Sequence, residues 1–235
     1  MIRTLLKPLV IASLVLGAAQ AHADTVDFLG SAHGGKTVNY SVMAGGLTAS
    51  GFGYAGGFTT TLNGGPLFTS YCVDLFEYIN FSDPAYTNYQ NVDASAHLFA
   101  NSRAVTDLGK LFSAHPVVST ELAETAFQSA VWEIAHETAS TSSLSSGKAK
   151  FWGGRAASDG ALTLASSWLS RLNDVTTITH LNVLESNAKT GAFGARPRQD
   201  VVFATPVPEP STYALMAAGL LSVGFVARRR SPRQA

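Results

Sequence analysis

Residues 120–137 read TELAETAFQSAVWEIAHE and form the clearest helical pattern of the chain. Ser119 or Thr120 can act as the N-cap, and two glutamates in the first turns face the positive end of the helix dipole. Apolar side chains recur at spacings of three and four and share one face: Leu122, Ala126, Phe127, Ala130, Val131 and Ile134. We therefore expect a helix from about Thr120 to Glu137, with this face against the core.

The chain before this helix has the composition of β-structure. From Thr25 to about Ile79 it is rich in β-branched and aromatic residues, and glycine pairs bound the expected strands 37–42 and 57–62. The Gly-rich stretch 45–65 would alternatively be a flexible loop. Its interleaved aromatic residues favour hairpins, because disordered linkers usually lack such side chains.

Further helices and two closing strands complete an α+β pattern. Asp93 or Ser95 is a candidate cap for a helix that ends near Phe112. The remaining expected elements are a Ser- and Thr-rich linker over 138–148, a helix over about 161–172, and strands over 177–184 and 199–203. This order predicts a β-rich N-terminal half, central helices and C-terminal strands that rejoin the first sheet.

The N-terminus has the three parts of a secretory signal peptide. Arg3 and Lys7 supply positive charge, residues 9–19 are apolar, and Ala21-His22-Ala23 places small residues at the cleavage positions. We expect signal peptidase to cleave after Ala23, so that residues 1–23 are removed. An uncleaved anchor is the alternative, but the apolar stretch is too short to favour it.

The C-terminal tail, residues 207–235, also has three parts. Pro208-Glu209-Pro210 is an extended motif, because proline denies the backbone helical continuity. An apolar run over 213–227 follows, and Arg228, Arg229 and Arg230 end it. Arginines stay on the cytoplasmic side of a membrane, so the chain before them is expected outside.

This tail resembles the PEP-CTERM sorting signal of Gram-negative bacteria. The resemblance implies recognition by an exosortase, which cleaves near the motif and releases the protein to the cell surface or the exopolysaccharide matrix of a biofilm. Until then the 213–227 helix would anchor the protein transiently in the inner membrane. An ordinary C-terminal membrane anchor is the alternative.

Charge and cysteine content limit what the exported part can do. Residues 24–206 carry ten basic and fifteen acidic residues, a formal net charge of minus five. Such a domain has no electrostatic reason to bind nucleic acid or anionic lipid. Cys72 is the single cysteine, so no intramolecular disulfide forms. Its thiol is therefore buried and inert, paired between molecules, or chemically committed.

Two short motifs stand out around this cysteine. Tyr71-Cys72-Val73-Asp74-Leu75 has the character of a strand, and alternation would place Cys72 and Asp74 on one face. On the 120–137 helix, residues at spacings of three and four form a polar stripe beside the apolar face: Glu121, Glu124, Gln128 and Trp132.

Together these motifs resemble the thioester domains of Gram-positive surface adhesins, which carry a Tyr-Cys strand and a Gln-x-Ala-x-Trp helix. The resemblance implies that Cys72 and Gln128 form an internal thioester, which captures a surface amine. The family commonly has threonine before the glutamine, whereas Phe127 stands here. Asp74 would orient an amide or take a proton, and Trp132 would shield the bond from water.

Other interpretations of the same residues stay open. Cys72 would be an inert packing residue in a structural or glycan-binding matrix protein. A Cys72–His136 pair would suit a hydrolase, but no family signature surrounds Cys72. Glu133 and His136 have a spacing used in di-iron bundles, but it occurs once. The other histidines have no ligand spacing, so we expect neither metal nor cofactor, and no enzyme.

Overall fold

The computed structural model describes residues 23–44, 47–79, 81, 85–138, 142–154, 160–186, 198–205, 216 and 218–222. The expected signal peptide lies outside these residues except for Ala23. The sorting motif and the arginine cluster lie wholly outside them. Of the expected 213–227 helix, Met216 and residues 218–222 are described and are helical. Among the described residues, no helix combines the length and the apolar character needed to cross a membrane.

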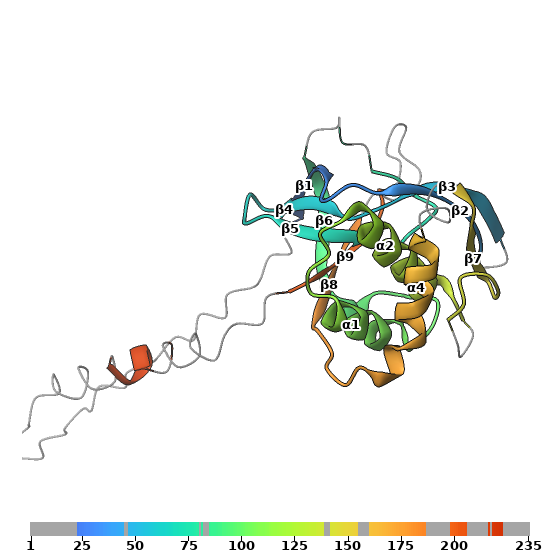
Figure 1. Cartoon of the computed structure of the whole chain (residues 1–235). Coiled ribbons are helices and arrows are strands. Elements are labelled where there is room, and N and C mark those ends of the chain that lie inside the picture. Colours follow the sequence, from blue (N-terminus) through green and yellow to red (C-terminus); the bar gives the residue numbers. More distant parts are fainter. Residues whose placement is uncertain are drawn as a thin grey trace, which may run out of the picture.

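Six antiparallel strands close into a barrel in the order β1-β4-β5-β9-β8-β6 (Figure 1). They are β1 (Asp24–Ser31), β4 (Phe58–Leu62), β5 (Phe68–Cys72), β6 (Tyr86–Asp93), β8 (Leu181–Ser186) and β9 (Val201–Ala204). The last two strands join β5 to β6, which are far earlier in the chain. The expectation that C-terminal strands rejoin the first sheet is therefore confirmed.

A second, three-stranded sheet has the order β3-β2-β7. The hairpin of β2 (Lys36–Ala44) and β3 (Leu47–Ala55) pairs residue by residue from Lys36–Ala55 to Ala44–Leu47, and β7 (Ala149–Trp152) adds to β2. Phe52 and Tyr54 of the Gly-rich stretch thus lie in a hairpin strand and Phe58 lies in barrel strand β4, so these aromatic residues belong to strands, as their presence predicts, and not to a flexible loop.

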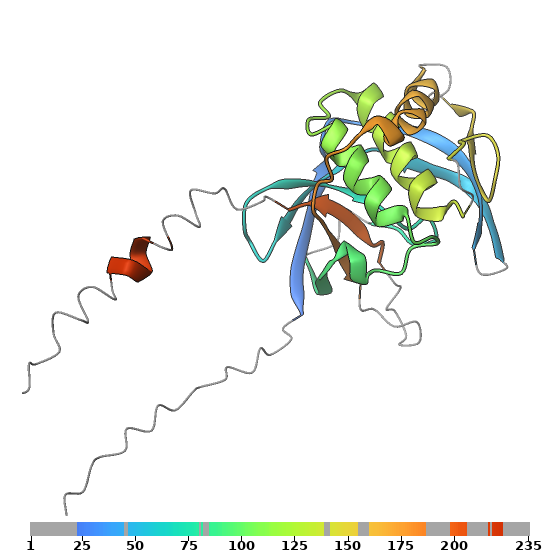
Figure 2. The same cartoon turned by 90° about the horizontal axis from the view of Figure 1, so that it is seen from below.

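Three α-helices pack together on one side of the two sheets (Figures 1 and 2). They are α1 (Ala104–Ala114), α2 (Glu121–His136) and α4 (Ala161–Ser170), with 3-10 turns at Ala94–Ala96 and Leu172–Asp174. The central helix α2 touches β2, β3, β5 and β7 as well as both other helices. It is the element that joins the barrel to the second sheet.

Helix α2 has more buried faces than its sequence predicts. The Thr120 hydroxyl caps it by accepting from Ala123 N, as expected. Every residue from Glu124 to Ala135 is buried, because sheets and helices surround the helix. The stripe of four residues beside the apolar face is therefore largely enclosed: Glu124, Gln128 and Trp132 lie in the interior, and Glu121 alone of the four is exposed.

The sequence does not predict two of the strands, β6 and β7. Residues 86–93 form β6 and not the start of a helix, and Asp93 caps only a 3-10 turn by accepting from Ser95 N. Strand β7 follows directly after the expected linker. Residues 177–180 precede β8 without being part of it.

All buried apolar side chains of the described residues lie between Val26 and Phe203. Both sheets and all three helices are also complete within residues 24–205. This segment therefore holds a single core and contains what is needed to fold without the two ends of the chain.

Candidate functional site

Cys72 is the last residue of β5, at the centre of the molecule. Its backbone lies opposite Val201 of β9, and its side chain is 1% exposed. Tyr71 and Val73 on either side of it are also buried. The single thiol of the chain is therefore enclosed where β5, β9 and α2 meet.

Gln128 approaches the same residue from α2. Its Oε1 accepts from Cys72 N at 2.9 Å, and its Nε2 donates to Cys72 O at 2.8 Å. Both hydrogen bonds are buried, and Gln128 is fully enclosed. The two residues that the sequence motifs single out, 56 positions apart, are thus in direct contact through the glutamine amide and the cysteine backbone.

The surroundings hold the thiol in its neutral form. Burial is the main cause that raises the pKa of Cys72 well above its ordinary value, and the charge of Asp74 raises it further. Desolvation and a nearby like charge both disfavour a thiolate. A thiolate is the reactive form of cysteine, so the closed site keeps Cys72 unreactive toward outside reagents.

Asp74 lies just beyond the end of β5 and does not share a strand face with Cys72. The expected alternation is wrong here because the strand ends at Cys72. The Asp74 carboxylate accepts from Phe76 N at 2.7 Å, and its backbone carbonyl accepts from the Gln199 side chain. In this structure Asp74 orients its own turn, and no hydrogen bond joins its side chain to Gln128 among the described residues.

Trp132 lies one helical turn after Gln128 and is 2% exposed. Its ring stacks on Phe151 of β7, with the centroids 6.0 Å apart and the planes 11° apart. Its indole N–H has no hydrogen-bond partner among the described residues. The ring also lines a pocket together with Leu75 and Phe76.

Glu124, one turn before Gln128, anchors a second buried polar group that sequence reasoning missed. Its carboxylate accepts from Gly57 N at 3.0 Å and lies 2.9 Å from Nδ1 of His33. Burial raises the pKa of the Tyr71 hydroxyl, and the charge of Glu124 and a side-chain hydrogen bond to it raise that pKa further. The cluster requires a glycine at position 57, because a Cβ there would lie only 2.7 Å from Glu124 Oε2.

The acidic and imidazole groups near the end of α2 do not form a metal site. His136 lines a cavity with Asp74, His97 and Asp200, and its burial lowers its pKa. Glu133, three residues earlier, accepts instead from Ser143 N at 2.6 Å. Among the described residues, no group of three or more His, Cys, Asp and Glu side chains is arranged to hold a metal ion.

The comparisons with known proteins concern the C-terminal tail. Residues 206–230 match the PEP-CTERM protein-sorting motif. The chain is therefore an exported protein of the Gram-negative type, and its processing partner is an exosortase. No curated protein and no solved structure matches the chain. The match shows how the protein is sorted. It says nothing about the chemistry of residues 24–205, which has to be inferred from the site described above.

Proposed function

We propose that the exported domain forms an internal thioester between Cys72 and Gln128 and attaches covalently to an amine on its target surface. The observation that carries this proposal is the two-point pairing of the Gln128 amide with the Cys72 backbone. Holding an acyl group and a nucleophile in one fixed geometry removes much of the entropic barrier to a reaction. A carboxamide is a poor acyl donor, so it needs that help.

The chemistry begins with attack of Cys72 Sγ on Gln128 Cδ. Charge develops on Oε1, which already accepts from Cys72 N and is stabilised there as in an oxyanion hole. The C–N bond to Nε2 breaks, the thiol proton goes to the departing nitrogen, and ammonia leaves. An amine on the target then attacks Cδ, forms an amide and returns the thiol of Cys72. Each molecule reacts once, so the protein is an attachment device and not an enzyme.

Burial suits the storage of such a bond. A thioester at this position would be shielded from water by β5, β9 and α2, and Trp132 would separate it from the neighbouring pocket. Asp74 would act indirectly, by setting the turn that follows Cys72. For a target amine to reach the thioester carbonyl, the site would have to open toward the pocket that Trp132 lines.

The test is the intact mass of purified residues 24–206 before and after exposure to methylamine. A mass short by one ammonia, which rises by one methylamine on exposure, is the expected result. The Gln128→Ala and Cys72→Ala variants would have full mass and gain nothing, and Gln90→Ala, on the exposed face of β6, would behave as the parent. A full mass with one titratable thiol in the parent would exclude the thioester.

A second candidate is a non-covalent structural or glycan-binding protein in which Cys72 is inert. The observation that favours it is that the Gln128 amide already satisfies two backbone groups of a fully buried residue. In that case the pair is a structural tie between α2 and β5. The full-mass outcome of the methylamine experiment would assign this function.

Both candidates fit the same destination. During export, signal peptidase would remove the signal peptide, and residues 213–227 would anchor the protein transiently in the inner membrane. Sorting by an exosortase would then leave the domain at the cell surface or in the exopolysaccharide matrix. Surface amines and the polysaccharide itself are then the available targets. Fractionation of cells that produce the tagged protein would show whether it reaches the matrix.

A further inference from the structure

A pocket of about 410 Å³ lies along strand β3 and faces the segment that follows Cys72. Strand β3 is the end strand of the three-stranded sheet, and residues 75–79 and 81 form the opposite wall. Trp132 of α2 and Phe58 of β4 contribute buried rings to the lining. The volume is within the usual range of ligand pockets, about 300–1,000 Å³.

Exposed aromatic rings gather around this pocket. Six aromatic side chains of the described residues are more than 40% exposed, and five of them line it: Phe52, Tyr54, Phe76, Tyr78 and Phe81. The sixth, Trp152 of β7, does not line it. Clustered apolar exposure of this kind marks an interaction site, whereas single exposed rings do not.

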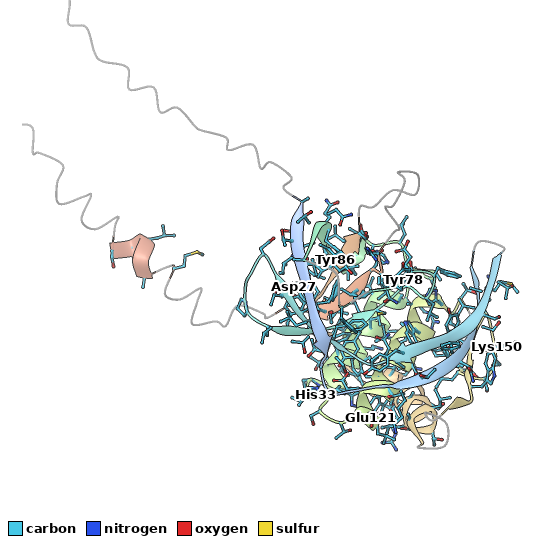
Figure 3. All side chains as sticks on the ribbon, turned by 90° about the horizontal axis from the view of Figure 1, so that it is seen from above. Asp27, His33, Tyr78, Tyr86, Glu121 and Lys150 are labelled. Carbon is cyan, nitrogen blue, oxygen red and sulfur yellow. The ribbon has the colours of Figure 1, made fainter. Side chains whose placement is uncertain are left out.

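The rings are held in place by the fold. Tyr54 OH donates to Ser31 Oγ at 2.9 Å, and the Phe81 ring lies 5.5 Å from that of Phe58. The guanidinium of Arg198 lies 5.7 Å from the Tyr78 ring and 5.0 Å from the Tyr86 ring, which are on one side of the molecule in Figure 3. A ligand would therefore meet preformed faces and pay little to order them.

Glycines in β3 open the way to the floor of the pocket. A Cβ at Gly53 would lie 3.4 Å from Trp132 Cη2 and 3.6 Å from the Tyr40 ring, and one at Gly51 would lie 3.3 Å from Tyr40 Oη. Larger side chains at these two positions would cover both rings. Of the two, Gly53 lines the pocket, and its lack of a side chain leaves room there for a flat ligand beside the Trp132 and Tyr40 rings.

Polar groups around the pocket are acidic or neutral. Glu77 and Gln199 line it, and burial together with the charges of Asp74 and Asp200 raises the pKa of Glu77 to about 7. The carboxyl and amide groups suit hydroxyls, and no Lys or Arg is among the described residues that line the pocket, although Arg198 lies beside the Tyr78 ring.

We propose that this pocket binds a segment of a neutral polysaccharide. The apolar C–H face of a sugar ring packs on aromatic rings, while its hydroxyls hydrogen-bond to side chains such as Glu77 and Gln199. An aliphatic lipid would leave these polar groups without partners, and a uronate polymer would find no Lys or Arg among the described lining residues to pair with its carboxylates. The site is separate from Cys72 and Gln128 and does not depend on a thioester.

The test measures binding of residues 24–206 to maltohexaose, cellohexaose, laminarihexaose and N-acetylchitohexaose by calorimetry, with polygalacturonate as the anionic comparison. At least one neutral oligosaccharide should bind. Phe52→Ala and Tyr78→Ala should each weaken that binding about two- to tenfold, the range of one aromatic contact. Phe52→Trp should retain it, and Trp152→Ala, which removes an exposed ring elsewhere, should leave it unchanged.

Several results would overturn the proposal. They are no binding of any neutral oligosaccharide, preference for polygalacturonate, or equal losses in Trp152→Ala and Phe52→Ala. Dimerisation that Phe52→Ala abolishes, seen by sedimentation, would assign the pocket to a second copy of the chain. Reversible binding should persist in Cys72→Ala, so failure here is distinguishable from failure of the methylamine experiment.

Discussion

The side-chain amide of Gln128 pairs with both backbone groups of Cys72, as the backbone of a neighbouring strand would. It thereby ties the central helix α2 to the end of β5. Both partners are enclosed, so neither backbone group of Cys72 at this point can turn to water instead. With the amide intact, the pair is a structural element of the core; formation of the thioester would release Nε2 and with it the hydrogen bond to Cys72 O.

Replacing Gln128 by alanine should destabilise the domain by about 2–5 kcal/mol, because two buried backbone groups lose their partner at about 1–3 kcal/mol each. Urea unfolding of residues 24–206 measures the effect. Gln90→Ala, at an exposed position of β6, is the matched control and should change the free energy of unfolding by less than about 0.5 kcal/mol. Equal effects of the two variants would contradict a structural role for the pair.

Replacing Glu124 by alanine should cost about 3 kcal/mol, since Gly57 N and the Tyr71 hydroxyl would lose a buried, charged acceptor. Glu124→Gln keeps a carbonyl acceptor and should cost less. Glu121→Ala, one turn earlier, removes only a partly exposed carboxylate 3.8 Å from Lys36 and should cost little. Thermal unfolding of the three variants side by side would give the order; similar melting temperatures would contradict it.

Stability should fall as the pH rises from about 6.5 to about 8, above the range in which the lowered pKa of His136 has the opposite effect. Burial raises the pKa of Glu133 to about 8 from its ordinary value of 4.5, and raises those of Glu77 and Asp200 to about 7 and about 6. In this range the unfolded chain has released protons that the folded chain still holds. The folded state is therefore favoured at the acidic end and loses that advantage as the pH rises through the folded pKa values.

Glu133→Gln isolates the largest part of this dependence. The glutamine keeps an oxygen for Ser143 N and removes the ionisation, so the variant should be more stable than the parent near pH 8 by a few kcal/mol, on the order of the pKa shift. Near pH 4.5 the two should be alike. Urea midpoints across this range provide the measurement, and parallel curves for parent and variant would show that Glu133 does not titrate in it.

Replacing Glu209 by alanine should leave the C-terminal tail attached, because the Pro-Glu-Pro segment is part of the matched sorting motif. The variant should remain in the membrane fraction at full mature mass, whereas the parent should be released without its tail. Arg233→Ala, outside the matched residues 206–230, is the control and should be processed normally. Normal release of Glu209→Ala would show that the motif is not read through this residue.

Local sequence patterns predict those elements of the fold that carry several independent signals at once. The 120–137 helix has a cap, a dipole-matched first turn and a regular apolar spacing, and it is found within one residue at each end. Strand β6 was missed because its sequence, YTNYQNVD, is polar apart from Tyr and Val. Only barrel closure against β1 and β8 makes that segment a strand. Asp74 was placed wrongly because the end of β5 depends on its pairing with β9.

Sequence motifs alone indicate that the protein is exported and sorted by an exosortase, and they single out Cys72 and Gln128, the two residues that meet at its centre. The tail motif and the single cysteine are local signals, which can be read without a fold. Tertiary packing is needed to bring Gln128 to the backbone of Cys72, to bury Glu124 beside Tyr71 and against the exposed His33, and to gather five exposed rings around one pocket. These contacts join residues far apart in the chain. Bringing such residues together costs conformational entropy, which is offset only when the barrel closes and packs on α2.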